Sequence, residues 1–353
     1  MMPDPHSLSH NPQPEQLVDP QGNVSFGIFP GTLHRINGRQ ADYRTPMGKP
    51  AGSLRRHFHY KQFQYFGIIS DSLLAGCALA DTGWLGLAFF YLFDTRTGEL
   101  SEFTWRSPLA GALSMSESPV NGSSEFRNKQ VSIRMGYQRD PDSGVLSKSL
   151  SLKSRDLTVD ALMEEPADYQ PMSICTRTGI NGWVYANKVA GRPVRGSIKA
   201  NGREIDLAGD GYFGHHDFSA GYMRRETFWN WACLSGEAQG KRIGLNLSCG
   251  VNETSYTENC IWLDDKLIKL NTVRFDYDRD NLLAPWQITS QDGKARLHFS
   301  PEGRHREHLN LGLFASNFNQ IFGRFDGQLQ DDDNNLIEVK NMYGFVEEQY
   351  AKW

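Results

Sequence analysis

Hydrophobic and polar residues alternate with a period of two along much of the chain. Residues 131–137 carry Val, Ile, Met and Tyr at every second position, and residues 243–247 carry Ile and two Leu in the same way. Successive side chains of a strand point to opposite faces, so this alternation predicts β-strands with one buried face. The apolar run at 84–93 predicts a buried strand, because it is about half as long as a membrane-spanning helix must be.

Turn residues between these segments support the same interpretation. Asn201-Gly202 separates two short strand-like segments, 197–199 and 204–207. This dipeptide predicts a tight hairpin, because both positions tolerate the positive φ angles that the turn needs. Further turns are expected at 97–98, 264–265, 292–293 and 331–335.

Helical periodicity is scarce in this chain. Residues 160–169 are expected to form a short helix or a loop, and residues 344–353 to finish with a helical turn, but neither carries a sustained amphipathic stripe. The 34 glycines and the many short strands indicate antiparallel sheets closed into barrels or sandwiches. The predicted fold class is therefore mainly β with few short helices.

The length of the chain predicts more than one structural unit, because 353 residues exceed what a single core usually supports. Residues 1–25 are rich in Pro, Gln and Asn and are expected to form a flexible N-terminal arm. The strand pattern breaks most strongly around 176–187. We therefore expect an N-terminal β-barrel domain at 26–185 and a C-terminal β-barrel domain at 186–353.

Charge and composition exclude several classes of function. The net charge is -4 and the Lys and Arg residues are scattered, so nucleic acid is not an expected partner. The five cysteines form no CxxC pair, which argues against a disulfide framework and a cysteine zinc site and suits a reducing compartment. No secretion signal or transmembrane segment is legible, so a cytoplasmic location is expected. Phosphate-binding and nucleophile-elbow motifs are absent, and neither a cofactor nor a metal is expected.

Titratable and aromatic side chains concentrate between residues 209 and 249. His216, Asp217 and Glu258 can transfer protons and are the candidate catalytic residues. Trp229 and Trp231, two apart on one strand, would share a face and could line an apolar pocket. The alternative interpretation is structural, because a tryptophan pair on a strand is usually core and Asp217 could tie down its own loop.

Four further polar residues are candidate ligand contacts. Arg224 and Arg225 could clamp a carboxylate or a phosphate through paired hydrogen bonds, although adjacent loop arginines are more often only solvated. Asn246 and Asn259 could orient a substrate hydroxyl or simply satisfy loop backbone groups. Burial would distinguish these alternatives.

A multi-part pattern in the second half of the chain resembles a bacterial family catalogued as domain of unknown function 2804. The resemblance covers the chain from about residue 30 onward, and such a pattern is more specific than any single motif. The matching residues are Asn187-Lys188, Gly191, Pro193-Val194, Gly196, Asp217-Phe218-Ser219, Gly221, Thr227, Trp229, Trp231, Asn246, Glu258-Asn259, Pro285-Trp286, Gly323 and Phe325.

The chain is more distantly similar to the hydroxyneurosporene synthase group of carotenoid hydratases. That similarity implies two tandem lipocalin-like barrels. The hydratase segment Gly-x-x-x-Asp-His-Glu-Trp would correspond to Gly211 and residues 215–218, but His215 replaces the aspartate, Asp217 the glutamate and Phe218 the tryptophan. These departures put hydratase chemistry in doubt and leave the fold as the firmer implication.

Three functions remain open from the sequence. The first is binding of a hydrophobic small molecule, such as a lipid or isoprenoid, in an aromatic-lined pocket with His216, Asp217 and Glu258 at its floor. The second is cofactor-independent acid-base chemistry on that ligand, of the hydratase or isomerase type. The third is a structural or interaction module with a filled interior and no ligand site.

Overall fold

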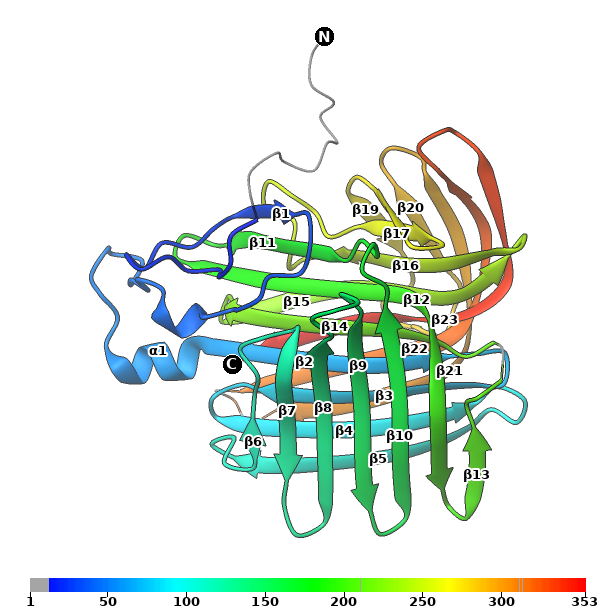
Figure 1. Ribbon diagram of the computed structural model, residues 1–353, viewed down its shortest axis with the longest axis horizontal. Helices are drawn as coiled ribbons and strands as arrows, with labels where there is room; N and C mark the ends of the chain where they lie inside the picture. The colour runs from blue at the N-terminus through cyan, green and yellow to red at the C-terminus, as the bar shows by residue number, and fades with distance from the viewer. Residues whose placement is uncertain (1–12, 210, 311, 313) are drawn as a thin grey trace.

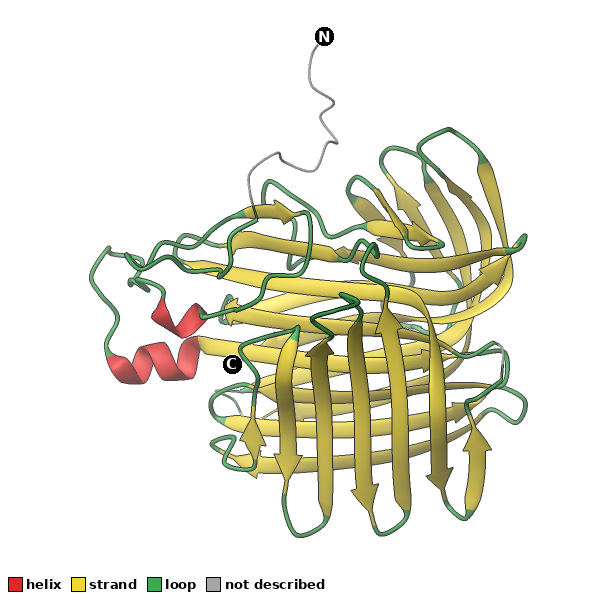
Figure 2. Ribbon diagram, viewed as in Figure 1, coloured by secondary structure: helices red, strands yellow, loops and turns green. Residues whose placement is uncertain are grey.

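The computed structural model describes residues 13–209, 211–310, 312 and 314–353, and most of them lie in β-strands (Figure 2). The strands form a 14-stranded sheet and a 9-stranded sheet, and every pair of neighbouring strands is antiparallel. One short α-helix, α1 (Ser53–His59), and one 3-10 turn, η1 (Gly38–Gln40), complete the described elements. The predicted mainly β class with few short helices is confirmed.

The first sheet contains the strands of the N-terminal part of the chain. Its main path runs β5-β4-β3-β2-β14-β12-β10-β9-β8-β7-β6, with β1, β11 and β13 attached beside it. Its strands are β1 (Gly27–Phe29), β2 (Tyr60–Ile69), β3 (Leu73–Asp81), β4 (Leu85–Asp94), β5 (Glu99–Pro108), β6 (Leu113–Ser114), β7 (Asn121–Arg127), β8 (Val131–Arg139), β9 (Leu146–Ser154), β10 (Leu157–Glu165), β11 (Met172–Thr178), β12 (Gly182–Ala200), β13 (Arg203–Asp206) and β14 (Phe213–Tyr222).

The second sheet takes the remainder of the chain in the order β18-β17-β16-β15-β23-β22-β21-β20-β19. It curves into a half-barrel, whereas the first sheet is nearly closed. Its strands are β15 (Glu226–Ala238), β16 (Lys241–Cys249), β17 (Cys260–Leu263), β18 (Lys266–Lys269), β19 (Val273–Asp276), β20 (Trp286–Ser290), β21 (Ala295–Asn310), β22 (Ala315–Gln330) and β23 (Leu336–Lys352).

The long strand β12 explains how the first sheet folds over on itself. Strands β2–β5 run across the view of Figure 1 and β7–β10 run down it, and β12 bends from one direction to the other. Its first half pairs with β11 and β14, and its second half pairs with β10 and β13. A register shift between Val189 and Arg192, with Gly191 at φ +74°, marks the bulge in this strand. Bulges of this kind bend and twist a strand.

The same bulge brings the two sheets into contact. A Cβ atom on Gly191 would lie 2.9 Å from the backbone nitrogen of Gly244 on β16, so only glycine allows this approach. The Gly191 amide, which leaves the ladder at the bulge, donates to Ser235 Oγ on β15 at 3.0 Å. The backbone of β12 is therefore anchored directly on the second sheet.

Two apolar cores result from this arrangement. The larger core joins the interior of the first sheet to one face of the second sheet, and it includes Trp231, Phe322 and Phe345 from the second sheet. The smaller core lies wholly in the concave side of the second sheet, around Trp286 and Phe299. The larger core therefore holds the two sheets together.

Several sequence predictions are confirmed at the level of single elements. The alternating segments 131–137 and 243–247 lie in β8 and β16, and the apolar run 84–93 becomes β4. Asn201 and Gly202 connect β12 to β13 with φ angles of 50° and 78°, as the tight hairpin requires.

Neither expected helix forms, although residues 166–169 are the loop that was the alternative for 160–169. Residues 157–165 form β10, in which Val159, Ala161 and Met163 face the core at period two. Residues 344–352 belong to β23, which is paired on both sides, with β15 and β22. In both places the sheet supplies backbone hydrogen bonds on either side, and tertiary pairing overrides weak local propensity.

The division of the chain also differs from the expected limits. The predicted boundary at 185/186 falls inside β12, and the chain passes from the first sheet to the second between Tyr222 and Glu226. Within the expected arm, Leu17 and Val18 are fully buried and Val18 donates to Asn37 Oδ1 at 2.9 Å. Residues 1–12 of that arm lie outside the described residues.

Candidate functional site

Two rows of side chains face each other where the sheets pack together. In the first sheet, Lys188, Asp217 and Tyr65 are directly opposite one another on β12, β14 and β2, and they form the first-sheet row. Directly opposed residues of antiparallel strands share one face. A second-sheet row forms in the same way on β21, β22, β23 and β15, from His305, Gln320, Glu347 and Trp231.

Ring contacts show that the two rows are in contact. The Trp231 ring meets the Tyr65 ring edge-on at 5.8 Å, and the Lys188 ammonium lies 4.5 Å from the centre of the Trp231 ring. His305 packs against Phe89 and Tyr91 of the first sheet, at 5.2 and 5.6 Å between ring centres. Polar groups from both sheets are therefore enclosed among aromatic rings.

Lys188 stands at the centre of what we call the inter-sheet cluster, formed by Lys188, Asp217, Glu258, Glu347 and His215. Its Nζ atom donates to Asp217 Oδ2 at 2.7 Å and lies 3.6 Å from Glu258 Oε1. Burial alone would lower the pKa of Lys188, but the facing carboxylates of Asp217 and Glu258 raise it above its ordinary value. The lysine therefore carries its charge inside the protein.

Neighbouring polar side chains hold the two carboxylates in place. Ser219 Oγ donates to Asp217 Oδ1 at 2.7 Å, and Asn252 Nδ2 donates to Glu258 Oε2 at 2.8 Å. Thr176 Oγ1 donates in turn to Asn252 Oδ1 at 2.7 Å. Because each acceptor oxygen that faces away from the lysine has its own donor, the geometry of the pair is fixed.

Glu347 is a third buried carboxyl group beside the same lysine. Trp229 Nε1 donates to its Oε2 atom at 3.1 Å, and Gln320 Nε2 donates to its Oε1 atom at 2.8 Å. Burial raises the pKa of Glu347 to about 8, although the Trp229 hydrogen bond and the Lys188 charge act in the opposite direction. This carboxyl group consequently keeps its proton at neutral pH.

His215 is buried on the same face of β14 as Asp217. It packs against Tyr65 and Phe345 at 5.2 Å between ring centres, over Gly67, where an added Cβ would lie 2.2 Å from His215 Nε2. Burial, and then the charge of Lys188, lower the pKa of His215 to about 3, so the ring is neutral. Neither ring nitrogen has a hydrogen-bond partner among the described residues.

Other buried polar atoms at this interface also lack partners among the described residues. They are His305 Nε2, Gln320 Oε1 and Gln349 Oε1. Buried polar atoms are almost always hydrogen-bonded in folded proteins, so a group of orphaned donors and acceptors requires an explanation. His305 and Gln320 belong to the second-sheet row, and Gln349 lies two positions after Glu347 on β23.

The structure separates His216 from the other predicted catalytic residues. His216 follows His215 on β14 and points into the interior of the first sheet, where its Nε2 atom lies 3.4 Å from the Tyr137 hydroxyl. Asp217 points the other way, because consecutive residues of a strand alternate between faces. Grouping His216 with Asp217 and Glu258 at one pocket floor is therefore corrected, and His215 takes its place beside them.

Most of the other predicted residues are brought together near the cluster. Trp231 Nε1 donates to Asn246 Oδ1 at 2.7 Å, and Asn246 Nδ2 donates to the backbone oxygen of Glu258 at 3.0 Å. Trp229 is partly exposed at the edge. Asn259 serves backbone groups, because it accepts from the amide of Ser248 at 2.6 Å and donates to the backbone oxygen of Asn271.

Arg224 and Arg225 lie elsewhere. They occupy the loop between β14 and β15, where they line a small pocket with Tyr43, His59 and Trp353. The two arginines are therefore not placed to clamp a ligand group that also contacts Asp217 and Glu258.

Sequence reasoning missed two central residues of the cluster. Lys188 stood in the family pattern without a role, and Glu347 fell in the segment expected to be helical. The signal for Lys188 was its place three residues before Gly191, on a segment that is otherwise mostly apolar. For Glu347 no local signal existed, because only its pairing with Trp231 brings it into the interface.

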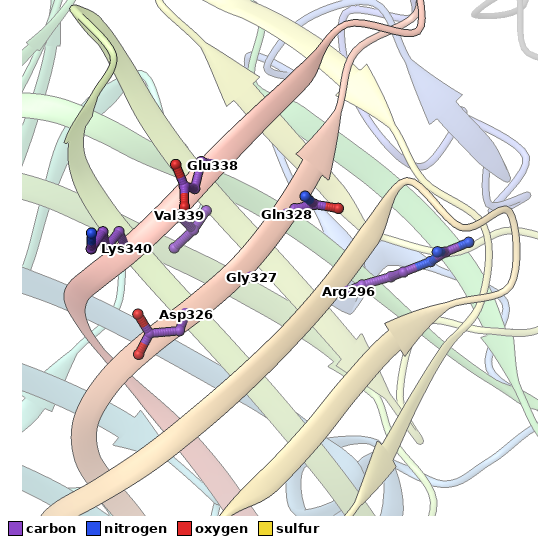
Figure 3. Close-up of a pocket in the computed structure, with 7 residues that line it drawn as sticks. All are labelled: Arg296, Asp326, Gly327, Gln328, Glu338, Val339 and Lys340. Atoms are coloured by element: carbon purple, nitrogen blue, oxygen red, sulfur yellow. The ribbon is translucent and has the colours of Figure 1, made fainter.

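A larger hollow of about 380 Å³ lies on the second sheet, over β21, β22 and β23, away from the cluster. The side chains at this hollow do not converge (Figure 3), so no ligand contact is assigned to it. They are Arg296, Asp326, Gly327, Gln328, Glu338, Val339 and Lys340.

Residues 13–209, 211–310, 312 and 314–353 contain no group of three or more His, Cys, Asp or Glu side chains placed to hold a metal ion. None of their helices has the length and apolar character needed to cross a membrane.

Solved structures of CghA share the fold of this chain at low sequence identity. CghA matches with a TM-score of 0.57 and 12% identity over 95% of this chain and 96% of its own. CghA with Sch210972 matches with a TM-score of 0.56 and 11% identity over 95% and 97%. Kievitone hydratase from Nectria haematococca gives 0.47 and 11% over 91% and 98%. At these identities, the CghA matches establish the fold alone.

Sequence comparison identifies the family. A search of the curated proteins gave no match to this chain. The family described as "Domain of unknown function (DUF2804)" matches residues 9–353, which is nearly the full length and agrees with the family predicted from the sequence. The chain belongs to the DUF2804 family.

Proposed function

We propose that this protein binds a hydrophobic small molecule that carries at least one hydroxyl or carbonyl group, at the inter-sheet cluster. The observation that carries the proposal is the set of orphaned polar atoms on His215, His305 and Gln320, which lie among buried aromatic rings. Ligand sites combine apolar walls with a few placed polar groups, and this interface has both.

Three further features support this proposal. Trp229 is partly exposed and donates to Glu347, so it connects the cluster with the protein surface. Trp231, Tyr65 and Phe345 give the apolar wall for a ligand, with ring centres 5.0 to 6.1 Å apart. CghA, which shares the fold, has been crystallised with Sch210972, so this architecture accommodates a bound compound in that protein.

Native mass spectrometry of the protein purified from its own host tests the proposal. We expect an organic molecule to copurify with the wild-type protein, and we expect Trp229→Ala to lose it, because the indole covers the edge of the site. Arg155→Gln, on a side chain that is 94% exposed, should retain it. Absence of any copurifying molecule, together with no displaceable binding of the uncharged dye nile red, would contradict the proposal.

Acid-base catalysis on the same ligand is a second candidate function, and the state of Glu347 favours it. A carboxyl group whose pKa is raised to about 8 can donate a proton at neutral pH. The neutral imidazole of His215 and the Asp217 carboxylate share the interface as potential proton acceptors. Isomerisation or hydration of a double bond begins with such a proton transfer.

Deuterium exchange separates this candidate from simple binding. The copurified molecule is returned to the protein in D₂O, and its mass is followed. A catalyst should introduce deuterium into the ligand or convert it, and Glu347→Gln should reduce the rate by roughly 10²-fold or more, as loss of a general acid does. Unchanged ligand with wild-type protein leaves binding as the function and removes catalysis.

A further inference from the structure

A second pocket lies beside helix α1, and none of its lining residues belongs to the inter-sheet cluster. It has a volume of about 210 Å³. The end of α1, the turn between β11 and β12, the loop between β14 and β15, and the C-terminal residue all reach it. Figure 1 shows the C-terminus lying next to α1 at this end of the molecule.

The pocket is lined by positive charge. Arg55, His59, Lys61, Arg224 and Arg225 line it, and none of the described residues that line it is Asp or Glu. Uncharged hydrogen-bonding side chains at its wall are Tyr43, Thr178 and Asn181. No ion pair joins the guanidinium of Arg55 or Arg224 to a described carboxylate within 4.0 Å.

The ammonium group of Lys61 is held in place at this pocket. Its side chain is buried, and its Nζ atom donates to the backbone oxygens of Phe58 and Thr82 at 2.6 Å. Burial lowers the pKa of Lys61 to about 8; the charge of Asp81 raises it and that of Arg225 lowers it. Lys61 therefore responds to the neighbouring arginine across the pocket.

His59 reports the same positive potential. Its Nδ1 atom lies 3.0 Å from the Tyr43 hydroxyl. Burial lowers the pKa of His59, and the charges of Arg55, Lys61 and Arg225 lower it further. Three cations from two separate segments of the chain thus disfavour protonation of one imidazole, which is the electrostatic condition that an anion would relieve.

We propose that this pocket binds a phosphate group, either free or carried by a small molecule. Guanidinium groups match the oxygen geometry of phosphate, and several cations around one hollow favour a dianion over a single carboxylate. The volume lies below the range of roughly 300–1,000 Å³ for drug-sized ligands, so it suits a small oxyanion. The chain supplies one competitor, because the main-chain oxygen of Trp353 accepts from Arg225 Nη1 at 3.3 Å.

Calorimetric titration with inorganic phosphate tests the site on the full chain. Wild-type protein should bind phosphate, and Arg55→Gln and Arg224→Gln should each weaken binding by about tenfold, the loss of one charge-assisted hydrogen bond. Both arginines are exposed, so the variants should keep their fold, which circular dichroism checks. Arg155→Gln, at an exposed arginine in the turn between β9 and β10, is the matched control.

The pKa of His59 gives an independent readout by NMR. Phosphate should raise it, because the anion offsets the charges of Arg55, Lys61 and Arg225, and acetate at the same ionic strength should raise it less. Methyl phosphate and vesicles of phosphatidic acid in phosphatidylcholine distinguish a soluble phosphate from a lipid headgroup, and binding of either supports the site. No binding in any arm, or acetate binding as tightly as phosphate, overturns the proposal and leaves the main-chain oxygen of Trp353 as a partner of Arg225.

Discussion

Lys188 is one ammonium group among three buried carboxyl groups, and this imbalance governs the chemistry of the interface. The lysine forms a close ion pair with Asp217 and a longer one with Glu258, and Glu347 adds a third carboxyl group nearby. One positive charge cannot neutralise three negative charges in a buried site. Protonation of Glu347 is the response that its raised pKa indicates.

Removing the ammonium group should destabilise the protein strongly. Lys188→Met leaves Asp217 and Glu258 buried without a counter-charge, and such a loss costs about 3–5 kcal/mol of unfolding free energy. Urea unfolding at pH 7.5 measures the change. Lys199→Met removes an exposed lysine from the same strand and should cost little. Equal losses of unfolding free energy for the two substitutions would show that the charge of Lys188 does not stabilise the fold.

The raised pKa of Glu347 makes stability depend on pH. In the unfolded chain this carboxyl group loses its proton near its ordinary value of 4.5, but in the folded protein it does so near pH 8. Between these values the folded state holds one extra proton, so stability from this group is complete below pH 4.5 and declines as pH rises to 8. The slope is about 1.4 kcal/mol per pH unit.

Glu347→Gln should remove that slope, because an amide does not ionise and keeps a similar shape. Unfolding free energies at pH 5, 6.5 and 8 give the comparison with the wild-type protein. Glu338→Gln changes an exposed residue on the same strand and should retain the wild-type slope. A slope that persists in Glu347→Gln would assign the extra proton to another group.

At the scale of elements, β14 shows what local pattern could and could not predict. Period two places His215 and Asp217 on one face and His216 on the other. The strand is buried at every described position, so no exposed residue reveals which face meets the second sheet. Asp217 and Glu258 were predicted because their side chains can transfer protons, and Trp231 because it shares a strand face with Trp229. Lys188 and Glu347 depended on pairings that join distant segments.

The contact between β14 and β2 supplies a prediction about shape. A Cβ atom at position 67 would lie 2.1 Å from Cε1 of His215, and the rings of Tyr65 and Phe345 leave the imidazole little room to move. Gly67→Ala should therefore cost about 1–3 kcal/mol of unfolding free energy through overpacking. Gly209→Ala, where a Cβ meets no atom within 4 Å, is the matched control.

His215→Ala should relieve part of that cost when combined with Gly67→Ala. The smaller side chain vacates the space that the new methyl group enters. The double variant should therefore lose less unfolding free energy than the two single variants lose in sum. A double-variant cycle in urea measures the coupling. Strict additivity would mean that the imidazole does not occupy the space over Gly67.

The larger apolar core holds the molecule together because it contains residues from both sheets. Trp231, Phe322 and Phe345 of the second sheet belong to the same apolar cluster as the interior of the first sheet. Gly191 and Gly244 also bring the two backbones into contact. Neither sheet can leave the other without exposing aromatic surface and the buried charges of the inter-sheet cluster, so we expect both sheets to unfold together.

Two truncations placed far apart test this cooperativity. Ile133→Ala opens space inside the first sheet, and Ile288→Ala opens space in the smaller core of the second sheet. Each should cost about 2–5 kcal/mol. If the molecule unfolds as one unit, each variant shifts the same single transition, seen alike by far-ultraviolet and near-ultraviolet circular dichroism. Two transitions, of which each variant moves only one, would instead show that the halves fold independently and that the inter-sheet contacts add little to their stability.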